Sequence, residues 1–92
     1  VLVRWKEGLH LRPAARLVKE ASNFQASISL KLDQQLADAR SIFAVALLSA
    51  TCGSVIDLEV SGADEEEAMA AMSEFFESDP DHDSAKNRFS SI

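Results

Sequence analysis

The stretch Ala26-Ser27-Ile28-Ser29-Leu30-Lys31-Leu32 alternates apolar and polar side chains along its whole length. Successive side chains of a β-strand point to opposite faces, so this alternation predicts a strand with one buried face and one solvated face. Strands of that kind are typical of antiparallel sheets that are covered on one side only. The stretch therefore predicts a sheet with a single apolar face, which helices would have to cover.

Three other segments are predicted as strands of the same sheet. Val1 to Trp5 and Val55 to Ser61 alternate in the same way, the second with its even-numbered residues facing inward. Asp33 to Gln35 is predicted to turn the chain, so that Leu36 to Asp38 returns as a short strand. This turn lacks the Asn-Gly or Asp-Gly pair that tight hairpins favour.

Three segments have the features of helices. Leu11 to Ser22 repeats apolar residues with helical period, and Asp64 to Phe76 carries an apolar stripe behind an acidic first turn, which the helix dipole favours. Ser41 can act as the N-cap of a short helix from Ile42 to Ser49. The order β-α-β-β-α-β-α predicts an α+β open-faced two-layer sandwich, in which a four-stranded antiparallel sheet has the helices on one face.

Length and composition narrow the possible functions. Ninety-two residues suffice for one domain, which we predict over residues 1–77, and the polar segment 78–92 is predicted to be a flexible tail. The net charge of −6 argues against nucleic acid as a partner. No apolar run approaches a membrane span, no signal peptide is visible, and Cys52 is the only cysteine. A single cysteine argues for a reducing compartment or for indifference to redox. We expect a cytoplasmic protein without membrane insertion, and a monomer.

The segment Gly8-Leu9-His10-Leu11-Arg12-Pro13-Ala14 predicts a chemical function. Pro13 suits the first turn of a helix, where its missing N–H costs nothing, and this places His10 at or next to the N-cap. The N–H groups and the dipole at a helix N-terminus attract anions, and the Arg12 guanidinium can bind two phosphate oxygens. Because imidazole can accept a phosphoryl group at neutral pH and release it again, the segment predicts a phosphoryl site at His10.

These residues resemble the active-site segment of the HPr family, the histidine phosphocarriers of the bacterial phosphoenolpyruvate-dependent sugar phosphotransferase system. The family pattern is Gly-(Leu/Ile/Met)-His-x-Arg-Pro-Ala. Ala39-Arg40-Ser41-Ile42-Phe43 is similar to the family's second signature, and Ser61-Gly62-Ala63-Asp64-Glu65 to the entry into its last helix. The likeness extends from Val1 to about Glu77 and implies the strand order 1-4-2-3. Family members usually have several more residues before this point, so the first strand is expected to begin upstream.

The resemblance implies a carrier protein and not an enzyme. Enzyme I, charged by phosphoenolpyruvate, would phosphorylate His10 while Arg12 contacts the phosphoryl oxygens. The group would then pass to the enzyme IIA domains of sugar uptake. No cofactor and no metal are expected. His82 lies among three aspartates of the tail, but the tail offers no frame that would hold these side chains in ligand geometry, so no metal site is predicted there.

Four further residues are expected to act in regulation or docking. The resemblance implies that Ser41, besides capping its helix, is the target of a dedicated kinase, the HPr kinase/phosphorylase found in many bacteria. Phe43 and Leu47 are four residues apart and share a helix face, which we expect to be exposed. The resemblance implies that this face docks partners. Arg16 would steer partners, or would only pair with Glu20 one turn later.

Two alternative functions stay open at this point. The chain could be the nitrogen-related paralogue of the carrier, which serves a regulatory phosphorelay and not sugar uptake. It could also be a regulatory binding module, in which phosphorylated Ser41 docks on a transcriptional regulator and His10 is idle. The presence of both His10 and Arg12 favours a phosphocarrier over the binding module.

Overall fold

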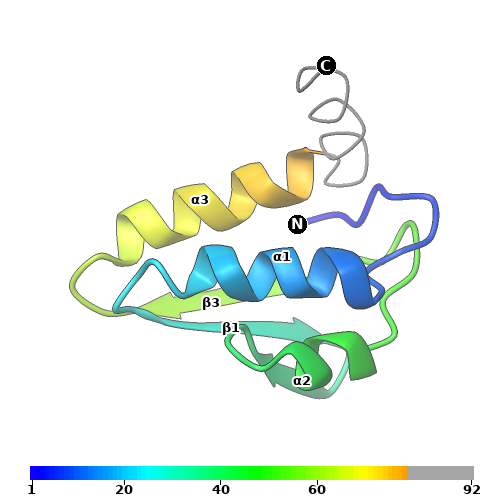
Figure 1. The fold of residues 1–92 in the computed structure, drawn as a ribbon, viewed down its shortest axis with the longest axis horizontal. Coiled ribbons are helices and arrows are strands. Elements are labelled where there is room, and N and C mark those ends of the chain that lie inside the picture. Colours follow the sequence, from blue (N-terminus) through cyan, green and yellow to red (C-terminus); the bar gives the residue numbers. More distant parts are fainter. Residues whose placement is uncertain (79–92) are drawn as a thin grey trace, which may run out of the picture.

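The computed structural model describes residues 1–78; residues 79–92 of the predicted tail, including His82 and its neighbouring aspartates, lie outside the described part. The elements follow one another along the chain in the order α1 (Leu11–Ala21), β1 (Ser27–Leu32), β2 (Gln35–Asp38), α2 (Ile42–Leu47), β3 (Asp57–Ser61) and α3 (Glu65–Glu77). Figure 1 shows α1 and α3 side by side over one face of the sheet, with α2 near its β2 side.

The three strands form an antiparallel sheet in the order β2-β1-β3. Leu30 in the central strand lies opposite Ala37 on one side and opposite Leu58 on the other, so inward side chains of all three strands form one row. The period-two pattern of the sequence thus sets which face meets the helices. The prediction of an α+β fold with helices over one face of an antiparallel sheet is confirmed.

The predicted N-terminal strand does not form. Leu2 makes only an isolated antiparallel bridge, to Val55. Val3 donates to the Ser54 carbonyl at 2.9 Å and accepts from the Gly53 N–H at 2.7 Å, so two residues oppose one, as in a β-bulge. Gly53 has the positive φ of 97° that such a bulge uses. The bulge interrupts the ladder, so the described residues form a three-stranded sheet, and the predicted four-stranded sheet with the order 1-4-2-3 is not confirmed.

The other predicted elements agree with the structure within about two residues at each end. α2 ends at Leu47 and not at Ser49, which has a φ of 56° that no helix can accommodate. β3 begins at Asp57 and not at Val55, since Val55 makes the isolated bridge to Leu2 and lies outside the ladder with β1.

The core lies between the sheet and the two long helices. Trp5, from the N-terminal segment, stacks on Phe76 with ring centroids 5.4 Å apart, and its indole N–H donates to the Ser78 carbonyl at 2.5 Å. These contacts hold the end of α3 against the segment that leads to α1. The largest fully buried side chains are those of Phe76, Leu9, Leu17, Ile28, Leu30, Ile56, Met72, Val3, Val45 and Pro13.

Asp64 connects the start of α3 to the start of β1. As the N-cap of α3 it makes no capping hydrogen bond with its own helix. Its carboxylate instead accepts from the backbone N–H groups of Gln25 and Ala26 at 2.9 and 2.8 Å. The hydrogen bond from Gln25, foremost, lowers the pKa of Asp64 from its ordinary value of 3.8, because it stabilises the ionised carboxylate.

We expect Asp64 to contribute to the acid sensitivity of the fold. A carboxyl group with a lowered pKa in the folded state stabilises the protein above its unfolded pKa, and this contribution is lost as the pH falls below 3.8 towards the folded pKa. An Asp64→Asn variant should therefore be less stable than wild type at pH 7 and should lose less stability between pH 4 and pH 2. Urea unfolding across this range checks the prediction. Equal pH slopes for the two proteins would contradict it.

Candidate functional site

The structure places His10 at the N-cap of α1, as predicted. Its backbone is extended, with φ −86° and ψ −167°, and its carbonyl accepts the N–H of Ala14 at 2.9 Å, which closes the first helical turn. Pro13 lies buried inside that turn. The imidazole does not cap its own helix, and 36% of the side chain is exposed. The ring is therefore accessible at the positive end of the helix dipole.

The loop before His10 is fixed by backbone hydrogen bonds. The Gly8 N–H donates to the Trp5 carbonyl and the Leu9 N–H to the Ala50 carbonyl, each at 2.9 Å. Gly8 has a φ of 75°, which L side chains rarely adopt. A Cβ there would collide with the Ala50 carbonyl oxygen and lie 2.9 Å from Thr51 Cα. Glycine thus lets the loop approach residues 50–51 closely and fixes the backbone that leads to His10.

One acidic neighbour of the imidazole was not predicted from the sequence. The Glu7 carboxylate lies 3.7 Å from His10 Nε2, in an i,i+3 arrangement. The motif that predicts the phosphoryl site begins at Gly8 and does not include Glu7. In the sequence, Glu7 is recognisable only as an acidic residue three positions before His10. Whether its side chain reaches the imidazole depends on the conformation of the turn between them.

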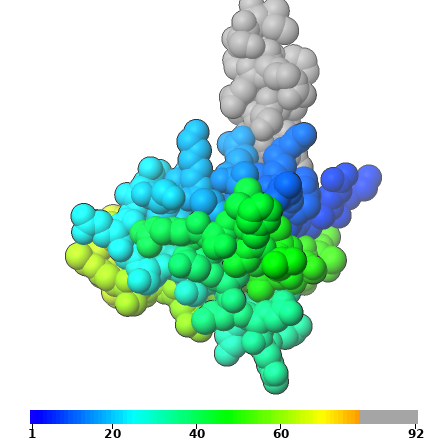
Figure 2. Space-filling view, turned by 60° about the horizontal axis from the view of Figure 1, so that its bottom comes forward, coloured from blue at the N-terminus to red at the C-terminus, as the bar shows by residue number. Residues whose placement is uncertain are grey.

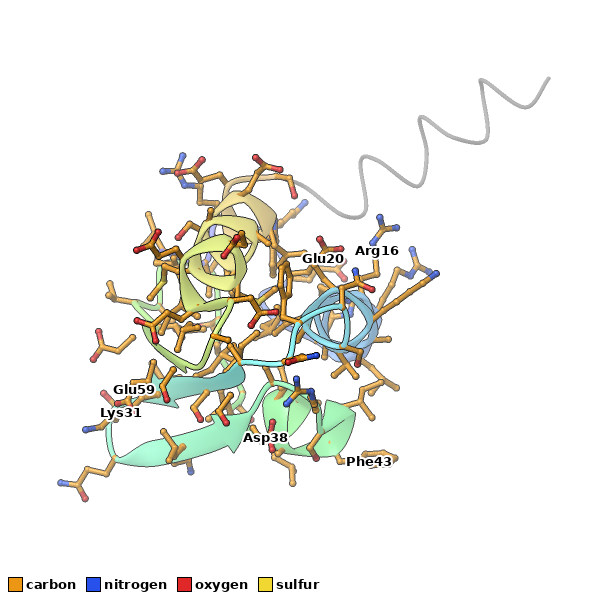
Figure 3. All side chains as sticks on the ribbon, turned by 90° about the vertical axis from the view of Figure 1, so that its left-hand side faces the viewer. Arg16, Glu20, Lys31, Asp38, Phe43 and Glu59 are labelled. Carbon is orange, nitrogen blue, oxygen red and sulfur yellow. The ribbon has the colours of Figure 1, made fainter. Side chains whose placement is uncertain are left out.

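The predicted basic residues Arg12 and Arg16 are exposed on α1, one turn apart. Arg12 is in the first turn, next to the N-cap histidine. Arg16 and Glu20 both line the groove between α1 and α3, and Figure 3 shows them on the outward side of α1. Lys6 and Lys19 are also exposed, so cations flank the site both before and along the helix.

The short helix α2 packs beside α1 (Figure 2). Ser41 is its N-cap, as predicted, with Oγ accepting the Ala44 N–H at 3.3 Å. The side chains of Phe43 and Leu47 are 72% and 75% exposed, which confirms their expected exposure, whereas Leu48 is buried. We call Arg16, Phe43 and Leu47, which the sequence predicts to contact partners, the docking residues.

Two further apolar side chains extend this exposed surface. Leu11, the first residue of α1, is 55% exposed, and Leu36 on β2 is 61% exposed. Leu36 lines a shallow groove together with Leu47 of α2. The sequence alone did not predict these two residues as part of the surface, because their exposure depends on how α1, α2 and β2 meet.

No helix within residues 1–78 has both the length and the apolar character that a membrane crossing requires. The fold and the site together define a small α+β domain with an accessible histidine at the N-terminus of its first helix. The family model described as the PTS HPr component phosphorylation site matches residues 1–78. The chain belongs to the HPr family of the phosphotransferase system, whose members are phosphocarriers and not catalysts.

Curated relatives that carry three different names resemble the chain. The phosphocarrier protein HPr of Xylella fastidiosa strain 9a5c is 43% identical over 84% of this chain and 86% of its own. The HPr-like protein Crh of Halalkalibacterium halodurans is 42% identical, over 84% and 92% respectively. The phosphocarrier protein NPr of Proteus mirabilis is 38% identical, over 90% and 93%.

Solved structures show the same fold. A crystal structure of HPr from Thermoanaerobacter tengcongensis superposes with a TM-score of 0.80 at 38% identity, covering 84% of this chain and 86% of that one. Crh of Bacillus subtilis, described as a domain-swapped dimer, superposes with a TM-score of 0.72 at 35% identity, covering 84% and 88%. The expected monomeric state of this chain stays a prediction.

Proposed function

We propose that this chain carries a phosphoryl group on His10, received from phosphorylated enzyme I and passed to the enzyme IIA domains of sugar uptake. The observation that carries the proposal is the position of His10 as the partly exposed N-cap of α1. A phosphoryl group there would lie at the positive end of the helix dipole, and Arg12 in the first turn would contact its oxygens. An open site of this kind suits a group that must be handed from one protein to another.

The sugar branch is favoured over the nitrogen branch by the names of the relatives. HPr proteins of two Xylella fastidiosa strains are 43% and 44% identical to this chain, whereas the NPr protein is 38% identical. We therefore propose the nitrogen-related phosphorelay only as the second function.

The docking residues would meet both the phosphoryl donor and the acceptors. Phe43 and Leu47 expose apolar surface on α2, beside the helix that carries His10. Arg16 adds a positive charge on α1. This combination of an apolar patch and flanking cations fits partners whose own docking surface is apolar at the centre and acidic around it.

Phosphoryl transfer in solution tests the proposed function. The full chain is incubated with phosphoenolpyruvate and enzyme I from a sugar phosphotransferase system, and in parallel with the corresponding enzyme of the nitrogen branch. We expect about one phosphoryl group per chain, faster from the sugar enzyme, in a linkage that is labile in acid and stable in base, as for a phosphoramidate. No uptake from either donor, or an acid-stable adduct, would refute the proposal.

We also propose Ser41 as a regulatory phosphorylation site for an HPr kinase/phosphorylase, through which a transcriptional regulator could read the state of the carrier. Ser41 is partly exposed, and its capping bond of 3.3 Å is long, so its hydroxyl can leave the cap at a cost of roughly 1 kcal/mol. Phosphate at this position would add negative charge two residues from Phe43, at the edge of the docking residues.

Two substitutions separate the capping role of Ser41 from the regulatory one. Ser41→Ala should lower the free energy of unfolding by roughly 1 kcal/mol, because the Ala44 N–H loses its side-chain acceptor. Ser41→Asp keeps a capping oxygen and should fold at least as well as wild type, yet bind enzyme I more weakly, because its charge opposes an acidic partner surface. Urea unfolding and enzyme I titrations at low and moderate salt measure the two effects. If Ser41→Asp binds enzyme I as tightly as wild type at both salt concentrations, the regulatory role of Ser41 is refuted and only its capping role remains.

A further inference from the structure

We propose that the segment Asp79-Pro80-Asp81-His82-Asp83, which we call the acidic segment, binds to the face of α1 that carries Arg12 and Arg16. There it competes with partners for the approach to His10. The observation that carries the proposal is the place where α3 ends, because Ser78, the residue before the acidic segment, lines the same groove as Arg16. The contact itself is independent of the proposed function, whereas its effect on transfer rests on that function.

The two long helices run in opposite directions, and this brings the start of the acidic segment to the site. At one end, the carboxylate of Asp64 at the start of α3 accepts from the backbone of Ala26, beyond the end of α1. At the other end, the Ser78 carbonyl accepts from the indole of Trp5, before α1 begins. Figure 1 shows this antiparallel pair, with the end of α3 towards the start of α1. The chain therefore enters the acidic segment beside the N-terminal half of α1.

The acidic segment is long enough to reach both arginines. Arg12 precedes Arg16 by one helical turn, which is about 6 Å along the axis at 1.5 Å per residue, and the two side chains therefore share a face. The N-cap residue His10 lies about 3 Å further along the axis. An extended chain covers about 3.3 Å per residue, so the five residues after Ser78 can span about 16 Å. Two carboxylates of the acidic segment can thus contact the two guanidinium groups at the same time.

The charges around the groove favour its end near the start of α1. The acidic segment carries three carboxylates. Glu20 and Glu74 line the groove and repel further carboxylates from it. Towards its start, α1 has no acidic residue before Glu20, it carries Arg12 in its first turn, and its dipole is positive. The exposed Lys6 offsets the charge of Glu7 in the preceding loop. The acidic segment should therefore bind at the start of α1.

The contact has the strength of a weak competitor. A carboxylate that binds Arg12 occupies the guanidinium to which the proposed function assigns the phosphoryl oxygens. Because the acidic segment is attached to α3, the encounter is intramolecular and its effective concentration does not depend on the protein concentration. Exposed ion pairs are individually weak and are screened by salt, so the acidic segment covers the arginines in only a part of the molecules. It lowers the apparent affinity for a partner without preventing binding.

Nitrogen-15 NMR of the full chain tests the contact without any phosphoryl donor. The test variant replaces the three carboxylates of the acidic segment, by Asp79→Asn, Asp81→Asn and Asp83→Asn. At about 20 mM salt, the side-chain Nε–H signals of Arg12 and Arg16 should differ between wild type and the test variant. At about 500 mM salt the difference should shrink, because charges more than about 5 Å apart are then screened.

The matched control changes the net charge equally at another place. It removes three exposed carboxylates from β3 and from the turn between β1 and β2, by Asp33→Asn, Asp57→Asn and Glu59→Gln. Asparagine tolerates the φ of 56° at residue 33. Figure 3 shows Glu59 on the sheet, away from Arg16. In the control, the two arginine signals should keep their wild-type positions.

Titration with enzyme I gives the second readout. A segment that covers the arginines in about two thirds of the molecules lowers the apparent affinity roughly threefold. At low salt the test variant should therefore bind enzyme I roughly threefold more tightly than the control, which corrects for the change in net charge. At about 500 mM salt the two proteins should bind alike.

Each failure has a distinct signature. Equal arginine signals in wild type and test variant at low salt would overturn the contact. A difference that grows with protein concentration would assign the contact to a second copy of the chain and would also overturn the proposal. Equal enzyme I affinities of test variant and control at low salt would overturn the competition. A wild-type chain that accepts no phosphoryl group, while the NMR difference persists, would refute the proposed function and support the contact.

Discussion

A His10→Ala variant is expected to accept no phosphoryl group from enzyme I, while the wild-type chain accepts about one. The substitution removes the only group at the N-terminus of α1 that can form a bond to phosphorus in the proposed mechanism. The side chain is partly exposed and does not cap its helix, so the free energy of unfolding should change by less than about 0.5 kcal/mol. Mass spectrometry of the intact chain after incubation with enzyme I and phosphoenolpyruvate measures the effect.

Arg12→Ala is the comparison that separates the nucleophile from the group that holds the phosphate. Its loss should slow transfer roughly tenfold to hundredfold, as for one hydrogen bond to a charged group worth about 1.5–3 kcal/mol, without preventing transfer. Its stability should also stay within about 0.5 kcal/mol of wild type, because the side chain is exposed. Phosphate on the His10→Ala chain would refute the assignment of His10. Normal transfer with a large loss of stability in Arg12→Ala would show that Arg12 is structural.

A Gly8→Ala variant is expected to lose about 2–6 kcal/mol of folding free energy, a large fraction of the stability of a small domain. Two effects add. The backbone at residue 8 has a φ of 75°, where a residue with a Cβ is strained by about 1–3 kcal/mol. The added methyl group would also collide with the backbone of residues 50–51, which must move away, and overpacking costs about 1–3 kcal/mol more. Urea unfolding at pH 7 measures the loss.

Gly53→Ala provides the matched control for the steric part of this effect. Gly53 also has a positive φ, 97°, but a Cβ there would meet no atom within 4 Å. It should therefore show the conformational strain alone and lose less stability than Gly8→Ala. The Gly8 variant should in addition accept the phosphoryl group more slowly, because displacement of the loop at residue 8 also moves His10, two residues later. Equal losses in the two variants would mean that contact with residues 50–51 contributes nothing.

Local patterns in the sequence were sufficient to predict most elements. Alternation predicted β1 and β3, helical period predicted α1 and α3, and the Ser41 hydroxyl predicted the start of α2. The motif around His10 predicted both its N-cap position and the family. The exposure of Phe43 and Leu47 was also predictable, since a helix as short and as apolar as α2 cannot bury all of its faces. These features depend on neighbours within about four residues, which is the range that such patterns describe.

Contacts between distant segments were decided only by the tertiary structure. The carboxylate of Asp64 binds the backbone of Gln25 and Ala26, not its own helix. The Arg40 guanidinium donates to the carbonyl groups of Phe24 and Ala26, which no local pattern indicates. In each case several partners are compatible with the sequence, and the packing of the whole chain selects the one that lies within hydrogen-bond distance.

The same division holds at the functional site and at the edge of the sheet. The sequence by itself determined that a histidine and an arginine stand at the start of a helix. Only the fold brought the Glu7 carboxylate to His10 Nε2, because that requires the tight turn held by the Gly8 and Leu9 backbone. Only the fold reduced the N-terminal strand to a single bridge, because a bulge at Gly53 is visible only once its partner strand is in place. Side-chain periodicity specifies faces and elements, whereas hydrogen-bond partners across the chain depend on distances that exist only after the core has packed.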